Sequence, residues 1–159
     1  MIGEMPGDDE DRSGKPFTGP AGKFLDGILE EIDLRRKDIY VTNVVKHFRW
    51  QPRGERRLHI KPSSRHILAC EHWLQKELFL VQPSLIVCLG ATAAQYMLGN
   101  QYRLTKQHGT IFTVDGEAPT MATYHPAAVL RAPHRSDRAK MRRLMIKDLS
   151  EASNFISRM

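Results

Sequence analysis

The sequence is poor in the features that mark secreted, membrane-spanning or repetitive proteins. It contains only two cysteines, Cys70 and Cys88, so a disulfide framework is not expected and a reducing, cytoplasmic compartment is favoured. No apolar run is long enough to span a bilayer. The first residues, MIGEMPGDDED, lack the basic and apolar regions of a signal peptide. There is no internal repeat, low-complexity tract or linker, and we expect a monomer that does not bind membranes.

What is present is the composition of an ordinary globular domain with a basic charge. The chain has 159 residues, of which 41% are hydrophobic, and this length is enough to bury a core. Its formal net charge of +6 is compatible with binding nucleic acid, but it is also common in proteins that never bind it. Charge alone therefore does not assign a function.

Strand-like and helix-like patterns alternate along the chain. Residues 21–34 place apolar side chains on one helical face, and the β-branched run 39–45 is typical of a buried strand. Ser63 and Ser64 are N-cap candidates for a helix that extends to about Val81. The remaining pattern predicts a strand over 84–90, a short helix over 91–99, strand-like segments over 110–114 and 120–125 around a turn at Asp115–Gly116, and a final helix over 136–157.

These repeated units predict an α/β fold, a three-layer α/β/α sandwich with a central, mainly parallel β-sheet. The whole chain, residues 1–159, is expected to form one domain. If GEMPG is the turn after a first strand, that strand consists of Met1 and Ile2 only. We therefore expect that the domain lacks its native N-terminal segment.

Polar segments follow the predicted strands, and in such folds ligands bind beyond the carboxyl ends of the strands. The four segments are GEMPGDDED with the PFTGPAG that follows it, Thr42–Asn43, the cationic loop GERRLH at 54–59, and HPAAVLR at 125–131. Their convergence at one edge of the sheet predicts a functional site more strongly than any single motif does.

Individual residues in these segments allow both functional and structural interpretations. Glycines around Glu4 let the backbone approach a ligand, whereas Asp9 and Glu10 are interpreted as part of a solvated loop or of a helix N-terminus. Phe17, between proline and glycines, suits base stacking as well as packing. An amide such as that of Asn43 can cap a turn or read a base edge.

The other candidates are basic or sulfur-containing. His125 is as easily a satisfied hydrogen-bond partner as a catalyst, and His47 and Cys70 suit the core. The cationic region after HPAAVLR suits a solvated helix face as well as phosphate contact.

Five ordered motifs carry a resemblance to a known family: GEMPGDDED with GKPFTGPAG, VTNVVKHF, ACEHWL, LIVCLGATAA and HPAAVLR. Together they resemble the uracil-DNA glycosylase superfamily, specifically its family-4 branch, over essentially the whole chain. The loop GERRLH resembles the KRRIH-type insertion of UdgX-like enzymes, which end as a covalent protein–DNA adduct through the loop histidine. VKHF, where ordinary members have a cysteine, also resembles UdgX.

The resemblance implies a mechanism acting on uracil-containing DNA, with single strands favoured. Phe17 would stack on the flipped base, the Asn43 amide would pair with its O4/N3 edge, and His125 would stabilise the charge on O2. Glu4 would assist the nucleophile and His59 would attack C1′. The further expected contacts are Met5, Gly7 and Asp8 with uracil, and Arg56, Arg57 and Arg131 with DNA phosphates.

The resemblance also implies an iron–sulfur cluster, with ligands at His47 and Cys70 and at an upstream cysteine pair. That pair is absent from this sequence. We therefore expect no cofactor in this chain alone, and a [4Fe-4S] cluster only in a longer native protein.

Two residues depart from the UdgX-like pattern. Glu55 stands where the loop has Lys, and Met5 stands where Gln is common. Two alternatives accordingly stay open. One is a conventional, multiple-turnover family-4 uracil-DNA glycosylase in base excision repair, in which His59 only contacts DNA. The other is a non-catalytic nucleic-acid-binding module, against which the joint presence of Glu4, Phe17, Asn43 and His125 argues.

Overall fold

A four-stranded sheet forms the centre of the protein in a computed structural model that describes residues 1–113 and 116–159. The strands lie in the order β2-β1-β5-β6, and each neighbouring pair is parallel. Their bounds are Ile2–Gly3 for β1, Thr42–Asn43 for β2, Ile86–Leu89 for β5 and Thr120–Thr123 for β6. All residues of these strands are buried, as expected for strands covered on both faces.

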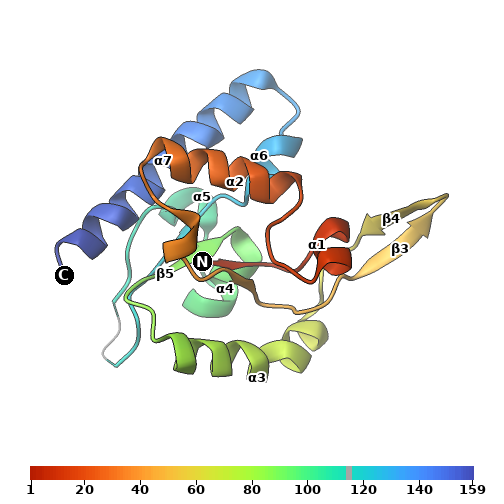
Figure 1. Cartoon of the computed structure of the whole chain (residues 1–159), viewed down its shortest axis with the longest axis horizontal. Helices are drawn as coiled ribbons and strands as arrows, with labels where there is room; N and C mark the ends of the chain where they lie inside the picture. Colours follow the sequence, from red (N-terminus) through yellow and green to blue (C-terminus); the bar gives the residue numbers. More distant parts are fainter. Residues whose placement is uncertain (114–115) are drawn as a thin grey trace.

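Helices form a layer on each side of this sheet (Figure 1). One layer contains α2 (Pro20–Glu31), α6 (Pro126–Arg131) and α7 (Arg135–Ser157). The other layer contains α3 (Ser64–Val81), α4 (Ala91–Leu98) and α5 (Leu104–Gln107). Among the described residues, no helix combines the length and the apolar character needed to cross a bilayer.

Strand β5 shows how the sequence distributes the core between the two layers. Ile86 and Cys88 belong to the apolar cluster beneath α3 and α4, whereas Val87 and Leu89 belong to the cluster beneath α2 and α7. Successive side chains of a strand point to opposite faces, so one short apolar run fills both clusters. This arrangement confirms the predicted three-layer α/β/α fold with a mainly parallel sheet.

The predicted helices form within a few residues of their expected ends, but two predicted strands differ. The strand expected over 39–45 is limited to Thr42–Asn43. The strand expected over 110–114 does not form over its described part, because the chain meets β6 only where Gly109 donates to Ala122 and where Phe112 bridges Thr120. The last residue of that prediction and Asp115 of the predicted turn lie outside the described residues.

The cationic segment predicted as a loop is instead a β-hairpin that projects from the body of the protein (Figure 1). Strand β3 (Trp50–Arg53) pairs antiparallel with β4 (Arg56–His59) through a two-residue turn at Gly54–Glu55. Gly54 has a φ of +59°, which a tight hairpin turn requires and glycine adopts without strain. The hairpin escaped prediction because its residues are mostly exposed and polar, so they show no apolar alternation.

Gly22 in α2 lets the helix approach the loop that carries Phe17. A Cβ on Gly22 would lie 1.8 Å from the Phe17 carbonyl oxygen, whereas a Cβ on Gly27 of the same helix would meet nothing within 4 Å. Phe17 itself has a φ of +55°, a conformation that a bulky residue adopts only when its surroundings impose it. The helix and the loop therefore fix one another.

Substituting these two glycines should change stability in opposite directions. We expect Gly22→Ala to lower the free energy of unfolding by about 3 kcal/mol through steric overlap with Phe17. Gly27→Ala should raise it by up to about 1 kcal/mol through helix propensity. Urea unfolding of both variants checks this, and a neutral Gly22→Ala would contradict the packing described.

Candidate active site

A cavity of about 540 Å³ lies beyond the carboxyl ends of the strands. The chain leaves β1 toward β2 on one side, while β5 lies on the other side of β1, so the strand order reverses at β1. The cavity opens at this point. Such switch points are the usual ligand sites of α/β sheets. The predicted site residues that line it are Glu4, Met5, Gly7, Asp8, Phe17, Asn43, Arg57, His59, His125 and Arg131. Arg56 is not among the lining residues. The expected convergence of the four segments is thus observed.

Asn43, which helps to line this cavity, has a buried hydrogen-bond acceptor that is unsatisfied. Its side chain is buried, and within the described residues its Oδ1 is the only buried side-chain nitrogen or oxygen without a hydrogen-bond partner. The main-chain oxygen of Asn43 accepts a hydrogen bond of 2.8 Å from Lys46 Nζ, which holds the end of β2. A buried acceptor without a donor costs free energy, so a ligand that donates at this point would be favoured.

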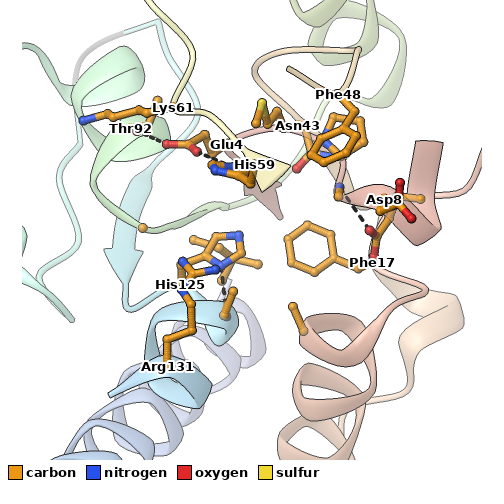
Figure 2. Close-up of a pocket in the computed structure, with 18 of the residues that line it drawn as sticks. Glu4, Asp8, Phe17, Asn43, Phe48, His59, Lys61, Thr92, His125 and Arg131 are labelled. Carbon is orange, nitrogen blue, oxygen red and sulfur yellow. Dashed lines mark hydrogen bonds and ion pairs between the residues drawn. The ribbon is translucent and has the colours of Figure 1, made fainter. Parts of the chain in front are cut away.

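Gly3 makes room for the two residues on this wall. A Cβ at Gly3 would lie 2.4 Å from Asn43 Oδ1 and 2.7 Å from Phe17 Cζ. The Phe17 ring is buried and lines the cavity, and its centroid lies 5.7 Å from that of His125 (Figure 2). Phe17 thus packs in the core and also forms an apolar wall of the cavity, and its stacking on a base stays a prediction.

His125 is held as a neutral imidazole whose tautomer is set by its own helix. It is the N-cap of α6, and its Nδ1 accepts the Ala127 N–H at 3.1 Å, so the ring hydrogen is on Nε2. Burial lowers the pKa of His125 to about 4. Glu4 opposes this shift, while Arg131 and His59 add to it. At neutral pH His125 can therefore donate one hydrogen bond without carrying a charge.

Burial of His125 predicts a loss of stability in mild acid. The folded-state pKa of about 4 lies below the ordinary value of 6.5, so the unfolded state binds protons first as the pH falls through this window. We expect the free energy of unfolding to lose up to about 3 kcal/mol between pH 6.5 and 4. His125→Asn keeps the capping acceptor but does not titrate, and its unfolding should depend less on pH. Urea unfolding across this window tests this, and equal pH dependence would contradict it.

Glu4, the residue after β1, contacts His59 of the hairpin at the wall of the cavity. His59 Nε2 lies 3.2 Å from Glu4 Oε1, and Thr92 of α4 donates its hydroxyl hydrogen to Glu4 Oε2 (Figure 2). Burial acts to raise the pKa of Glu4, but the hydrogen bonds from His59 and Thr92 outweigh it and lower this pKa below its usual value. Glu4 is therefore an ionised carboxylate that accepts hydrogen bonds from His59 and Thr92.

Arg57 anchors the hairpin over the cavity. Its guanidinium pairs with Asp8 and with Asp11 of α1 (Asp8–Ser13), the latter at 2.6 Å. It also lies 5.2 Å from the ring centroid of Phe48 and 5.4 Å from that of Trp50. Opposite charges thus bring the Arg57 guanidinium and the Asp8 carboxylate together in this structure. Contacts of Arg57 with phosphate and of Asp8 with uracil stay predictions.

Glu10 and Thr92 have structural roles that the sequence did not reveal. The Glu10 carboxylate accepts hydrogen bonds from the backbone N–H groups of Gly7, Thr18 and Gly19. Glu10 lies in the first turn of α1, which agrees with the helix N-terminus that was one of its two interpretations. It ties the turn after β1 to the loop that carries Phe17. The position of Thr92 just after β5 could have predicted that it lies at the ligand site, because polar side chains that follow the strands reach this site.

Comparison with known proteins agrees with this geometry. The family model of the Uracil DNA glycosylase superfamily matches residues 1–150. The chain belongs to the uracil-DNA glycosylase superfamily. It is 35% identical over 159 residues to the Type-4 uracil-DNA glycosylase of Thermotoga maritima, covering 99% of this chain and 77% of that protein. It is 39% identical over 141 residues to the Type-4 uracil-DNA glycosylase of Archaeoglobus fulgidus, covering 84% of this chain and 67% of that protein.

The iron–sulfur ligands that this superfamily's family-4 branch implies are present only in part. His47 Nδ1 lies 3.6 Å from Cys70 Sγ, which also accepts the Lys46 N–H. Within residues 1–113 and 116–159, no group of three or more His, Cys, Asp or Glu side chains is placed to hold a metal ion. Two donors do not fit the ligand set of a cluster, and in this structure they connect α3 to the segment after β2.

The two residues that depart from the UdgX-like pattern occupy different environments. Met5 is buried in the core beneath α3 and α4, and it lines the cavity. Glu55 is exposed in the hairpin turn and does not line the cavity. The substitution at Glu55 therefore leaves the cavity unchanged, whereas Met5 adds an apolar side chain to it.

Proposed function

We propose that this protein excises uracil from DNA and ends covalently bound to the resulting abasic site through His59. Excision would begin the repair of uracil in DNA. The observation that carries the proposal is the Glu4–His59 pair, with 3.2 Å between its nearest atoms, in a cavity that also holds Asn43 and His125. We propose that the enzyme acts as a monomer.

Base recognition is assigned to Asn43 and Phe17. The unsatisfied Oδ1 of Asn43 suits the N3–H of uracil, and its amide hydrogens suit the O4 acceptor of the same base. Cytosine presents an acceptor at N3 and an amino donor at C4, so it would leave both groups of Asn43 mismatched. The Phe17 ring provides the stacking face, which any base satisfies. Specificity therefore comes from Asn43 and affinity for the flipped base from Phe17.

Departure of the base is assisted by His125. When the N-glycosidic bond breaks, its electron pair goes to uracil, and negative charge grows on O2. The Nε2–H of His125 is free to donate to this oxygen because Nδ1 already binds the Ala127 N–H. A donor that is already oriented in a partly dry site stabilises developing charge without reorganising. The low pKa of His125 means that this stabilisation is a hydrogen bond rather than proton transfer.

Departure of uracil leaves C1′ electron-deficient, and an imidazole nitrogen of His59 supplies the electron pair that forms the new C1′–N bond. The ring proton that faces Glu4 stays on the alkylated imidazolium, whose positive charge is paired with the Glu4 carboxylate. Uracil departs as an anion and later takes up a proton from water. The C1′–N bond has no easily leaving partner, unlike an ester intermediate, so turnover stops at the adduct.

DNA is expected to reach the cavity as a single strand. Base flipping costs least when the base is neither paired nor stacked. Arg131 lines the cavity and Arg56 is exposed on the hairpin, where both can contact phosphates. With Arg57 occupied by carboxylates, we assign the phosphate contacts of the hairpin to Arg56.

The second candidate function is hydrolytic turnover, which the names of the Type-4 relatives favour. In that case water attacks C1′ and His59 only contacts DNA.

The two candidates differ in the number of uracils that one protein molecule releases, so the test uses an excess of uracil-containing single-stranded oligonucleotide over protein. We expect one uracil released per protein molecule and a complex that survives boiling in detergent. An oligonucleotide with cytosine in place of uracil should give neither product, and release of many uracils per molecule would contradict the covalent mechanism.

A further inference from the structure

We propose that Trp50 is a stacking platform for a base adjacent to the flipped nucleotide of a single-stranded DNA, an inference that rests on the proposed function. Trp50 begins β3, and 42% of its surface is exposed, although tryptophan is highly buried on average. It is not among the residues that line the cavity. Binding of uracil itself therefore does not account for this exposed aromatic side chain.

The hairpin register places Trp50 directly beside His59. The two residues are cross-strand partners, and the neighbouring pair, Arg49 and Ile60, is joined by a backbone hydrogen bond. Trp50 and His59 therefore form a non-hydrogen-bonded pair, in which Cα atoms lie about 4.5 Å apart and side chains share one face. A strand that places C1′ at His59 brings a neighbouring nucleotide within reach of Trp50.

The Trp50 ring is held in place rather than free to move with solvent. The Arg57 guanidinium lies 5.4 Å from its ring centroid and is itself fixed by Asp8 and Asp11. A cation on one face of the indole leaves the other face for a further stacking partner. This makes Trp50 a preorganised surface, which lowers the entropic cost of binding.

Charge on the same hairpin selects nucleic acid as the occupant. Arg53 and Arg56 are cross-strand partners on the opposite face from Trp50 and are both exposed. Within the part of the chain that the structure describes, neither forms a salt bridge. A stacking aromatic side chain combined with free cations is the usual composition of a single-strand binding surface. A duplex would not supply a base to stack on Trp50, because each of its bases is already stacked on both faces.

The test measures binding without chemistry. The probe is a short single-stranded oligonucleotide that contains one 2′-fluoro-deoxyuridine, whose fluorine disfavours a cationic sugar and so keeps the base attached. Two further probes lack the base on the 5′ or the 3′ side of this nucleotide. Dissociation constants are measured for the wild type, Trp50→Ala, Trp50→Phe and the control Trp73→Ala. Trp73 is a matched control, since it is 54% exposed and has Lys76 over its ring, but it lies on α3.

We expect Trp50→Ala to raise the dissociation constant about tenfold, and Trp50→Phe to raise it by no more than about threefold. Removal of one neighbouring base should weaken the wild type by a similar factor and should not weaken Trp50→Ala further. Trp73→Ala should bind like the wild type. Unchanged binding by Trp50→Ala would overturn the proposal. It would also be overturned if removal of the neighbouring base weakened binding by Trp50→Ala as much as it weakens binding by the wild type.

A purely structural role of Trp50 would give a different result. If the side chain only positioned the hairpin, Trp50→Ala would displace His59 and slow adduct formation or uracil release even at saturating protein. The stacking role predicts a saturating rate within about twofold of the wild type. A large fall in that rate with an unchanged dissociation constant would contradict stacking. Absence of an adduct in the wild type would count against the covalent mechanism alone, because the binding assay does not depend on it.

Discussion

Replacing His59 with alanine is expected to abolish the covalent adduct and to leave a protein that releases uracil by hydrolysis. The adduct yield should fall at least about 100-fold, because the variant lacks the nitrogen that forms the stable bond. Asn43, His125 and Glu4 remain in the cavity, so the bond to uracil can still break and water can reach C1′. Denaturing gels measure the adduct, and the uracil released per protein molecule measures turnover.

Lys61 provides the matched control for this substitution. Its side chain also lines the cavity, and a lysine amine can trap the aldehyde of an abasic site. We expect Lys61→Met to form the adduct like the wild type. A crosslink that persists in His59→Ala and disappears in Lys61→Met would move the covalent chemistry to Lys61 and overturn the assignment of His59.

Replacing Asn43 with alanine is expected to lower the rate of uracil release at least about 100-fold, the usual effect of losing a hydrogen bond that is made in the transition state. The variant removes the only group that we assign to reading the N3–H and O4 of the base. Affinity for the oligonucleotide should change little, because phosphate contacts supply most of it. Single-turnover rates and dissociation constants on the same oligonucleotide separate the two effects.

Asn100→Ala is the control for this experiment, since Asn100 is exposed and does not line the cavity. It should match the wild type in both measurements. An Asn43→Ala variant that excises uracil at the wild-type rate would show that the unsatisfied Oδ1 atom has another role. An equal loss of rate and DNA affinity would instead indicate that the end of β2 is disrupted.

Apolar patterns predicted the helices and the strands β5 and β6 from the sequence, but they predicted a longer strand at β2 and a strand over 110–114 that does not form over its described part. The run 84–90 predicted β5 because every residue of the strand is buried, and the stripe after Ser63 predicted α3 because one face of this helix packs in the core. Asn43 and His125 were found for a related reason. Asn43 is the last residue of β2 and His125 lies two residues after β6, and ligands of such sheets bind beyond the carboxyl ends of the strands.

Contacts between distant residues were not predictable in the same way. Arg57 pairs with Asp8 across 49 positions, and Thr92 donates to Glu4 across 88 positions. Each of these side chains is as compatible with solvent as with a partner, so periodicity carries no signal for them. The hairpin was missed for the same reason, because its strands are stabilised by backbone pairing and by Arg57 rather than by burial.

The site of covalent attachment tests the central claim most directly. After reaction with uracil-containing single-stranded DNA and nuclease trimming, tryptic cleavage after Arg57 and Arg65 isolates residues 58–65, LHIKPSSR, because the Lys61–Pro62 bond resists trypsin. Tandem mass spectrometry should find the deoxyribose remnant on this peptide, at its single histidine, His59. A modification at Lys61 or on any other peptide, or unmodified protein alongside free uracil, would contradict the account.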